Sequence, residues 1–206
     1  MPKTDYKKDF KELYIPRQAP MLIDVPPMNF IMIDGRGDPD GSEYQNAVSA
    51  LYSLSYTIKM KGRDVSGYYE YTVFPLEGLW WTDGGAFDFQ KRSNWMWTSM
   101  IRQPDFVTPE VFKWALELTQ KKKKELDFSK ARFESFTEGL CVQALHIGPY
   151  AEEPATIEKI QAYMKENRLL DKTGSLQKHH EIYLSDPNKV PSEKMNTVIR
   201  HPAEKV

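Results

Sequence analysis

The sequence predicts an α+β fold made of two copies of one strand–helix–strand–strand unit. We expect two antiparallel sheets about a pseudo-twofold axis, with the helices on one face. Two distant segments read almost alike, SMIRQP at 99–104 and TVIRHP at 197–202. Each is preceded by a β-prone segment that begins at a glutamate and ends at a proline, EYTVFP at 70–75 and EIYLSDP at 181–187. Self-similarity in a fixed order indicates an internal duplication.

Each copy opens with an apolar strand that is followed by a helix. The strands are NFIMIDGRGDP at 29–39 and LCVQALHIGPY at 140–150, and both end in a Gly/Pro turn. Helical patterns follow at about 41–61 and at about 153–168. The stripes at helical spacing are Val48, Leu51, Ser55 and Ile58 in the first helix and Ile157, Ile160 and Met164 in the second.

We expect a single domain over residues 1–206, with the copies at about 16–107 and 128–206 and a helix at about 109–125 between them. Thr108 is a suitable N-cap for that helix, and the proline that follows suits the first helical position. The lysine-rich end of the helix is explained by the helix dipole, which favours cations in the last turn. The alternating segment ARFESF then predicts an edge strand.

The composition favours a soluble, cytoplasmic protein that neither binds nucleic acid directly nor enters a membrane. Lys and Arg number 28 against 29 Asp and Glu, whereas a general nucleic-acid binder has a basic excess. Cys141 is the only cysteine, so no disulfide can form within the chain and a reducing compartment is indicated. No apolar run approaches the ~20 residues of a membrane helix, and the N-terminus lacks a secretory signal. The oligomeric state stays open.

The sequence carries no motif for a bound phosphate, a metal ion or an activated serine. GxxxxGK[ST], HExxH and GxSxG are all absent. His179 and His180 are adjacent, so on a strand they point to opposite faces and cannot bind one metal together. His146 and His201 are isolated, which is typical of packed or exposed histidines, and Cys141 lies in an apolar strand that predicts a buried, inert thiol. We therefore expect no cofactor and no metal.

Aromatic residues are concentrated in the first copy. Four of the five tryptophans lie between residues 65 and 100. Trp95 and Trp97 are two apart and share a face on a strand, as do Tyr69 and Tyr71. Core packing explains some of these side chains, but strands with aromatics on one face can also line an aromatic pocket. The expected ligand-contacting residues are Tyr69, Trp80, Trp95, Trp97, His179 and Tyr183.

Glu181, in HHEIYLS, is the candidate acidic residue of this pocket. On a strand, His179, Glu181 and Tyr183 share one face. An exposed carboxylate on a solvated face is the ordinary interpretation. In an aromatic cleft, burial would instead raise the pKa of Glu181. It could then pair with a cationic planar ligand held by cation–π contacts, or act as a general acid or base.

A family resemblance rests on the duplicated plan, on the segments PLEGLWW and EIYLSDP, and on the endings MIRQP and VIRHP. By these features the chain resembles the GyrI-like small-molecule-binding superfamily over residues 16–202. The chain is most similar to the stand-alone bacterial members. The resemblance implies a concave, aromatic-walled pocket between the two halves, with Glu181 as the acidic residue at its base. Related transcription regulators carry a DNA-binding helical segment before the ligand domain. Only about 28 residues precede the first predicted strand here, so we expect the ligand domain alone.

The resemblance leaves several functions open. The first is a protein that binds planar amphipathic or cationic small molecules, in drug or toxin resistance. The alternative is a hydrolase that opens the cyclopropane ring of cyclopropanoid DNA-alkylating compounds, as some stand-alone members do. Glu181 would then activate water, and Tyr71 would stabilise the negative charge that develops on the substrate. Tyr71 is chosen because its segment, YYEYTVF, is the counterpart in the first copy of HHEIYLS. A gyrase-type protein–protein inhibitor is less favoured, with DGRGDPDGSE as its acidic surface loop.

Overall fold

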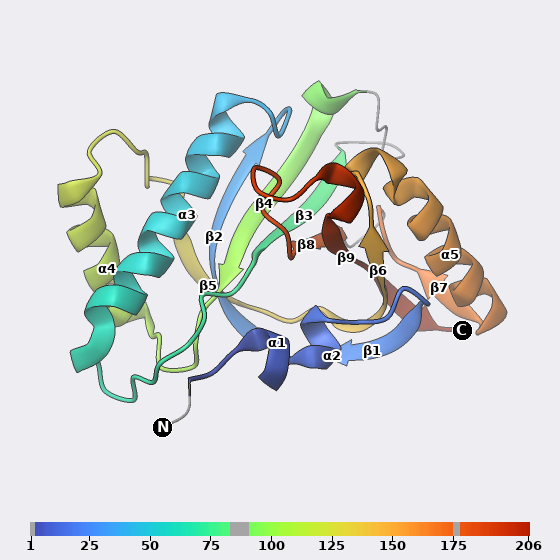
Figure 1. Cartoon of the computed structure of the whole chain (residues 1–206), viewed down its shortest axis with the longest axis horizontal. Coiled ribbons are helices and arrows are strands. Elements are labelled where there is room, and N and C mark those ends of the chain that lie inside the picture. Colours follow the sequence, from blue (N-terminus) through green and yellow to red (C-terminus); the bar gives the residue numbers. More distant parts are fainter. Residues whose placement is uncertain (1–2, 83–90, 175–177) are drawn as a thin grey trace.

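The structure is a computed structural model that describes residues 3–82, 91–174 and 178–206 (Figure 1). The α+β class is confirmed. The helices are α1 (Tyr6–Asp9), α2 (Lys11–Tyr14), α3 (Ser42–Lys61), α4 (Pro109–Lys122) and α5 (Glu153–Glu166). The strands are β1 (Met21–Val25), β2 (Met28–Arg36), β3 (Leu76–Thr82), β4 (Trp95–Arg102), β5 (Arg132–Phe136), β6 (Gly139–Ile147), β7 (Leu169–Asp171), β8 (His179–Tyr183) and β9 (Asn196–Lys205).

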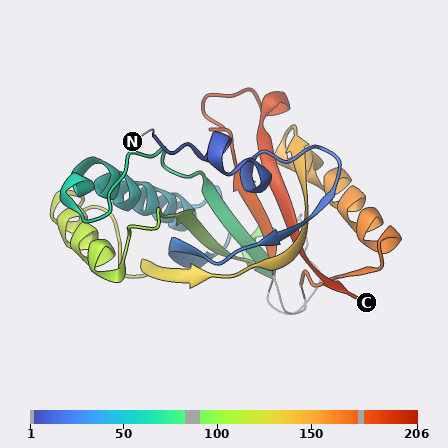
Figure 2. The same cartoon turned by 90° about the horizontal axis from the view of Figure 1, so that it is seen from below.

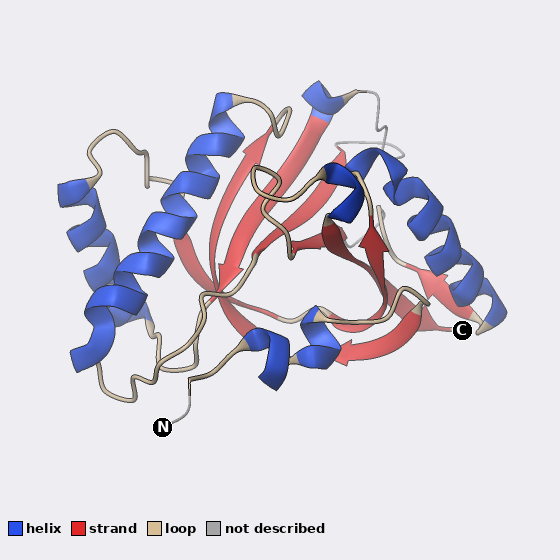
Figure 3. Cartoon of the chain, in the orientation of Figure 1, coloured by secondary structure: helices blue, strands red, loops and turns tan. Residues whose placement is uncertain are grey.

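The strands, drawn in red in Figure 3, form one antiparallel sheet in the order β1-β6-β9-β8-β3-β4-β2-β5, and β7 pairs with β9. The two predicted sheets are thus joined into one, because β3 of the first copy pairs with β8 of the second. This pairing satisfies backbone groups that two separate sheets would leave unpaired at their facing edges. Helices α3 and α4 lie at one end of the sheet and α5 at the other (Figure 2).

The strand registers reveal which residues are equivalent in the two copies. Ile101 of β4 pairs with Leu76, and its echo Ile199 of β9 pairs with Glu181. Leu76 is therefore the structural counterpart of Glu181, and only one of the two copies carries the acidic residue.

The strand predicted at 70–75 does not form. Apart from an isolated bridge between Tyr71 and Thr4, these residues are a loop, and β3 begins directly after Pro75. Proline has no N–H to donate to a strand ladder, so it separates the loop from the strand. The prediction aligned the two copies by Glu70 and Glu181. It therefore placed the strand that corresponds to β3 too early in the chain, at Glu70 instead of Leu76.

The first strand of each copy pairs with a strand of the other copy. Strand β1 of the first copy pairs with β6, and β5 of the second copy pairs with β2, so each edge strand of the sheet lies against the other copy. Strand β1 was not predicted from the sequence. It is a short strand whose residues alternate between exposed and half-buried before Val25, so it carries a weak apolar signal.

The helices agree closely with their predicted limits. Leu51, Ser55 and Ile58 of α3 are buried, as are Ile160 and Met164 of α5. Helix α4 follows β4 in the chain, and the Thr108 hydroxyl accepts a hydrogen bond from the Val111 N–H as an N-cap does. No helix within the described ranges has the length and apolar character needed to cross a membrane.

Candidate functional site

Glu181 lies on β8, near the middle of the sheet, opposite Gly78 of β3. Its side chain is only 13% exposed. His179 and Tyr183 share its face of the strand, as the alternation predicts. Glu181 Oε1 lies 2.9 Å from Nε2 of the buried His179. The carboxylate is thus held by a neighbouring ring and is not a solvated surface group.

Glu153 is a second carboxyl group in this site, and the sequence analysis missed it. It is the first residue of α5 and is 2% exposed. Burial, together with the adjacent Glu181 carboxylate, raises the pKa of Glu153 well above its usual range. Its Oε1 atom has no hydrogen-bond partner among the described residues. A carboxyl whose pKa is raised in this way beside a second carboxyl is an arrangement suited to acid–base chemistry.

An aromatic cluster lies on the same face of the sheet. The Trp80 Nε1–H group donates to the Tyr183 hydroxyl at 2.9 Å. The Trp80 ring lies 5.6 Å from that of Trp95 and 5.5 Å from that of Tyr44 on α3. Tyr44 also contacts Trp97 edge to face at 5.1 Å. Four of the six predicted ligand-contacting residues, Trp80, Trp95, Trp97 and Tyr183, are brought together in this way.

Tyr44 and Tyr150 are tyrosines of this cluster that the sequence analysis did not single out. Tyr150 is 36% exposed, and its ring meets that of Tyr183 at 5.9 Å. Burial and the nearby Glu181 raise the pKa of Tyr150 to about 12. Burial likewise raises the pKa of Tyr44. Both hydroxyls are neutral near pH 7 and can therefore donate hydrogen bonds. Tyr44 lies on a helix and Tyr150 in a turn. Neither position predicts from the sequence that the residue belongs to the site.

Three donor atoms are close enough to hold one divalent cation. The ligand atoms of Glu153, His179 and Glu181 all lie within 4.8 Å of one another. His and carboxylate ligands suit zinc and similar ions. The same geometry suits a proton held between the two carboxyls. The expectation of no metal therefore stays a prediction.

A family model for the GyrI-like small-molecule-binding domain matches residues 18–203. The chain belongs to the GyrI-like family. Crystal structures of Listeria innocua proteins resemble this GyrI-like protein over 98% of its chain and all of theirs. An uncharacterized conserved protein is 49% identical with a TM-score of 0.94, and two structures of a hydrolase are 47% and 48% identical with TM-scores of 0.90 and 0.92. No curated protein matches the chain.

In this GyrI-like protein, Tyr69 and Tyr71 lie outside the aromatic cluster. Their rings pack against Phe106 at 5.4 and 5.9 Å, and Lys59 Nζ lies 5.0 Å above the Tyr71 ring. The observed register makes Leu76, and not a residue of 70–75, the counterpart of Glu181, so the duplication gives Tyr71 no equivalent place in the site. Of the remaining aromatic residues between 65 and 100, Phe87 and Phe89 lie outside the described residues.

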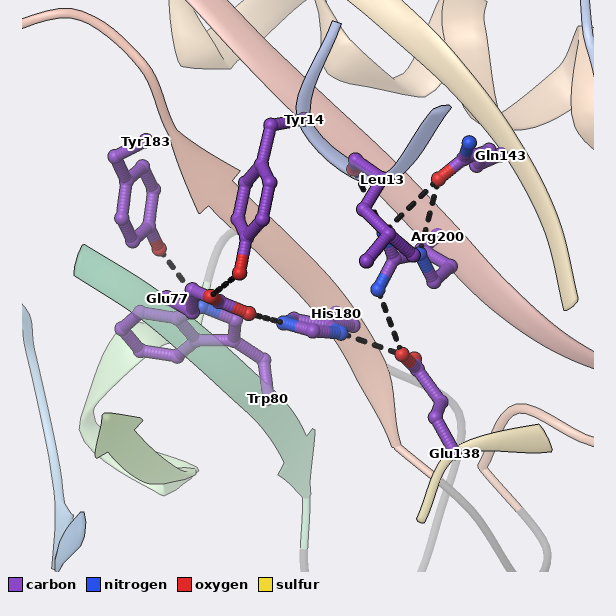
Figure 4. Close-up of polar contacts among 9 residues, drawn as sticks. All are labelled: Leu13, Tyr14, Glu77, Trp80, Glu138, Gln143, His180, Tyr183 and Arg200. Carbon is purple, nitrogen blue, oxygen red and sulfur yellow. Dashed lines mark hydrogen bonds and ion pairs between the residues drawn. The ribbon is translucent and has the colours of Figure 1, made fainter. Parts of the chain in front are cut away.

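The opposite face of the sheet carries a buried charge network (Figure 4). His180 lies between Glu77 at 3.0 Å and Glu138 at 2.9 Å, so it points away from His179 as predicted. Arg200 bonds Glu138 at 2.9 Å. Two carboxylates thus face an imidazolium and a guanidinium. Burial opposes these charges, but Glu138 and Glu77 raise the pKa of His180 to about 9.

Proposed function

We propose that this GyrI-like protein is a hydrolase for planar electrophilic small molecules, with Glu181 as the base that activates water. The observation that carries the proposal is the buried pair of Glu181 and Glu153, whose carboxyl oxygens lie within 4.8 Å of each other. Burial and the Glu181 carboxyl raise the pKa of Glu153 well above its usual range, which agrees with this role. Two adjacent carboxyls with unequal proton affinity supply a base and an acid at the same pH. A site that only binds cations needs the first carboxylate but not a protonated second one.

The substrate class follows from the aromatic cluster and from the family. Trp80, Trp95 and Tyr44 offer rings against which a planar ligand can pack. Relatives at 47% and 48% identity are hydrolases. Together with the family resemblance, this favours cyclopropanoid DNA-alkylating compounds, whose strained ring is conjugated to a carbonyl group.

The proposed reaction adds one water across a bond of the strained ring. Glu181 accepts a proton as the water oxygen forms a bond to the ring carbon. The ring C–C bond breaks, and its electron pair moves into the conjugated system toward the carbonyl oxygen. That oxygen gains a proton from a neutral donor, for which Glu153 and the hydroxyls of Tyr44 and Tyr150 are the candidates. The product equals substrate plus water, so no cofactor is consumed.

The test is to mix the purified protein with a cyclopropanoid alkylator. Loss of the conjugated chromophore is followed by absorbance, and mass spectrometry identifies a product heavier by one water. Glu181→Gln is expected to lower kcat by about 10²–10⁴-fold, the usual contribution of general acid–base catalysis. Binding of the neutral substrate should persist, because the amide preserves the shape of the side chain.

Glu152→Gln is the matched control, since Glu152 precedes Glu153 in the chain and is exposed. It should retain wild-type turnover. Saturable binding without turnover by the wild type would contradict the hydrolase and favour a protein that sequesters or senses planar or cationic compounds in drug or toxin resistance. In that case, Glu181→Gln would weaken the binding of cationic ligands and leave the binding of neutral ligands nearly unchanged.

A further inference from the structure

Glu153, His179 and Glu181 form a cluster in which two largely buried carboxyls lie beside an imidazole. Their ligand atoms lie within 4.8 Å of one another. Among the described residues, neither carboxyl forms an ion pair with a lysine or an arginine, and Glu153 Oε1 has no hydrogen-bond partner. On the opposite face of the sheet, by contrast, the buried carboxylate of Glu138 pairs with Arg200. Buried carboxylates are usually paired with cations or bind metal ions, so this cluster is suited to a bound metal ion.

The three residues come from two different elements. His179 and Glu181 are two apart on β8, so both side chains project from the same face of the sheet. Glu153 is the first residue of α5, and the helix brings its carboxyl to the two strand residues. His180 faces Glu77 on the other side of the sheet, as the alternation predicts, and does not share a metal with His179. The third ligand comes from a helix, which strand alternation cannot reveal.

His179 is oriented by hydrogen bonds on the side that faces away from the carboxyls. His179 Nδ1 lies 2.9 Å from His201 Nε2, and His201 Nδ1 lies 3.0 Å from Asp171 Oδ2. His201 is thus not isolated, because the pairing of β9 with β7 and β8 brings it between these two residues. Metal-binding histidines are usually held by such a hydrogen bond on their second ring nitrogen. His179 Nε2 is directed at the cluster, where it lies 2.9 Å from Glu181 Oε1.

We propose that Glu153, His179 and Glu181 bind one Zn²⁺ ion. Imidazole together with carboxylates favours zinc over Mg²⁺ and Ca²⁺, which prefer oxygen ligands alone. The ligand atoms of a tetrahedral zinc lie about 3.5 Å apart, so the widest separation in the cluster has to close by little more than about 1 Å. Rotation about the side-chain torsions of Glu153 can supply this movement. Three protein ligands leave the fourth position of the ion open to water or to a bound molecule.

Binding exchanges a proton for the metal ion. In the metal-free protein, one hydrogen joins His179 Nε2 and Glu181 Oε1. Zinc takes a lone pair of each atom, and the displaced hydrogen leaves to the buffer as a proton. A zinc-bound carboxylate is a poor base, so Glu181 can no longer take a proton from water. The ion is therefore an inhibitor of the hydrolase, and this consequence alone rests on the proposed function.

The first measurement is calorimetric titration of Zn²⁺ into chelator-treated protein that carries no histidine tag. The wild type should bind one ion per chain, and excess Mg²⁺ should not compete. Glu153→Gln keeps the size of the side chain but removes its charge. It should raise the Kd for zinc by at least about 100-fold, since loss of even an outer-shell partner typically costs about 10–100-fold. Glu152→Gln, at the exposed neighbouring residue, should retain the wild-type Kd.

Crystals of the wild type grown with one equivalent of Zn²⁺ locate the ion without any substitution. Anomalous scattering at the zinc edge should place it between Glu153, His179 and Glu181. An ion bound only elsewhere, or the absence of saturable binding, would overturn the site. A Glu153→Gln protein that is folded by circular dichroism and binds zinc as tightly as the wild type would overturn it as well.

Turnover of the cyclopropanoid compound separates the zinc site from the proposed function. Saturating Zn²⁺ should lower kcat of the chelator-treated wild type by about 10²-fold or more, the contribution expected of a lost base, and a chelator should restore it. Zinc bound at the site without loss of turnover would overturn the inhibition. Turnover that appears only with zinc would overturn both the inhibition and the role of Glu181 as a free base. Absence of turnover under both conditions would refute the proposed function, whereas calorimetry and the anomalous map would still decide the metal site.

Discussion

At the residue scale, Gly78 provides the space in which the candidate site is built. It lies opposite Glu181 in the β3–β8 pair. A Cβ atom at this position would lie 2.6 Å from Trp80 Nε1 and 3.1 Å from the Tyr183 hydroxyl. These are the two atoms joined by the hydrogen bond beside Glu181. The missing side chain of Gly78 therefore allows two aromatic residues to meet across the sheet.

We expect Gly78→Ala to lower the free energy of unfolding by about 1–3 kcal/mol, because the added methyl group overpacks a buried contact. Binding of planar ligands should weaken in parallel, since Trp80 must move. Urea unfolding and ligand-induced tryptophan quenching measure the two effects. Gly62→Ala is the control, because a Cβ atom there meets its nearest neighbour at 3.8 Å. Equal losses in the two variants would contradict the explanation.

The two carboxyls of the site differ in how far the sequence could predict them. Glu181 could be selected because strand alternation places it with His179 and Tyr183, and because its segment matches a family pattern. Glu153 could not, since an acidic residue in the first turn of a helix is ordinary and is explained by the helix dipole. Its contact with Glu181 depends on where α5 packs, which local patterns do not encode.

At the scale of elements, polar bonds attach helix α2 to the face of the sheet that carries the buried charge network. Arg200 Nη2 donates to the Leu13 carbonyl at 2.9 Å, and Gln143 Nε2 donates to that of Glu12 at 2.6 Å. The Tyr14 hydroxyl donates to Glu77 Oε1 at 3.2 Å. Figure 4 shows Tyr14 and Leu13 directed toward this buried network. Helix α2 thus supplies hydrogen-bond partners to Arg200, Gln143 and Glu77 of the buried network.

Removing the Tyr14 hydroxyl tests this role of α2. Tyr14→Phe is expected to lower the free energy of unfolding by about 1–3 kcal/mol, because it leaves a buried acceptor on Glu77 without its partner. Tyr56→Phe serves as the control, since Tyr56 is 50% exposed. Thermal and urea unfolding give the comparison. A Tyr14→Phe protein as stable as the control would show that Glu77 does not depend on this bond.

Among the elements, the repeated segments were the most predictable. Strand β4 contains SMIR of SMIRQP, and β9 contains the whole of TVIRHP. The helices that follow β2 and β6 begin within a residue of their predicted positions. The start of β3 was predicted wrongly, because Glu70 was matched to Glu181. Pro75, which cannot donate to a strand ladder, in fact separates this glutamate from the strand that begins at Leu76. Strands β1 and β7 are short, and their residues are partly exposed, so apolar periodicity gives little signal for them.

At the scale of the whole molecule, the buried charges link stability to pH. The pKa of His180 is raised to about 9, so its contribution is full below its ordinary value of 6.5 and is lost as pH rises through 9. Burial opposes the charge of Glu138, but His180 and Arg200 lower its pKa to about 2. Its contribution is full above 4.5 and is lost as pH falls through 2. Their sum is greatest between 4.5 and 6.5.

We expect the loss of stability between pH 6.5 and 9 to shrink in His180→Gln, as measured by urea unfolding. Glu153 acts in the same direction, because its raised pKa also makes stability fall as pH rises above 4.5. The comparison is therefore made in a Glu153→Gln background. An NMR titration of His180 in the wild type gives the same test without a substitution. A neutral His180 ring at pH 8 would refute this assignment.

The exchange of edge strands has a consequence for synthesis of the chain. The free edge of β2 is covered only by β5, with Met28 paired to Phe136. When the first copy emerges from the ribosome, its sheet still lacks this strand, which belongs to the second copy. We therefore expect the sheet of the first copy to be completed only after residue 136 has left the ribosome. Folding of one copy at a time, which is common for independent domains, would leave the edge of β2 unpaired in this protein.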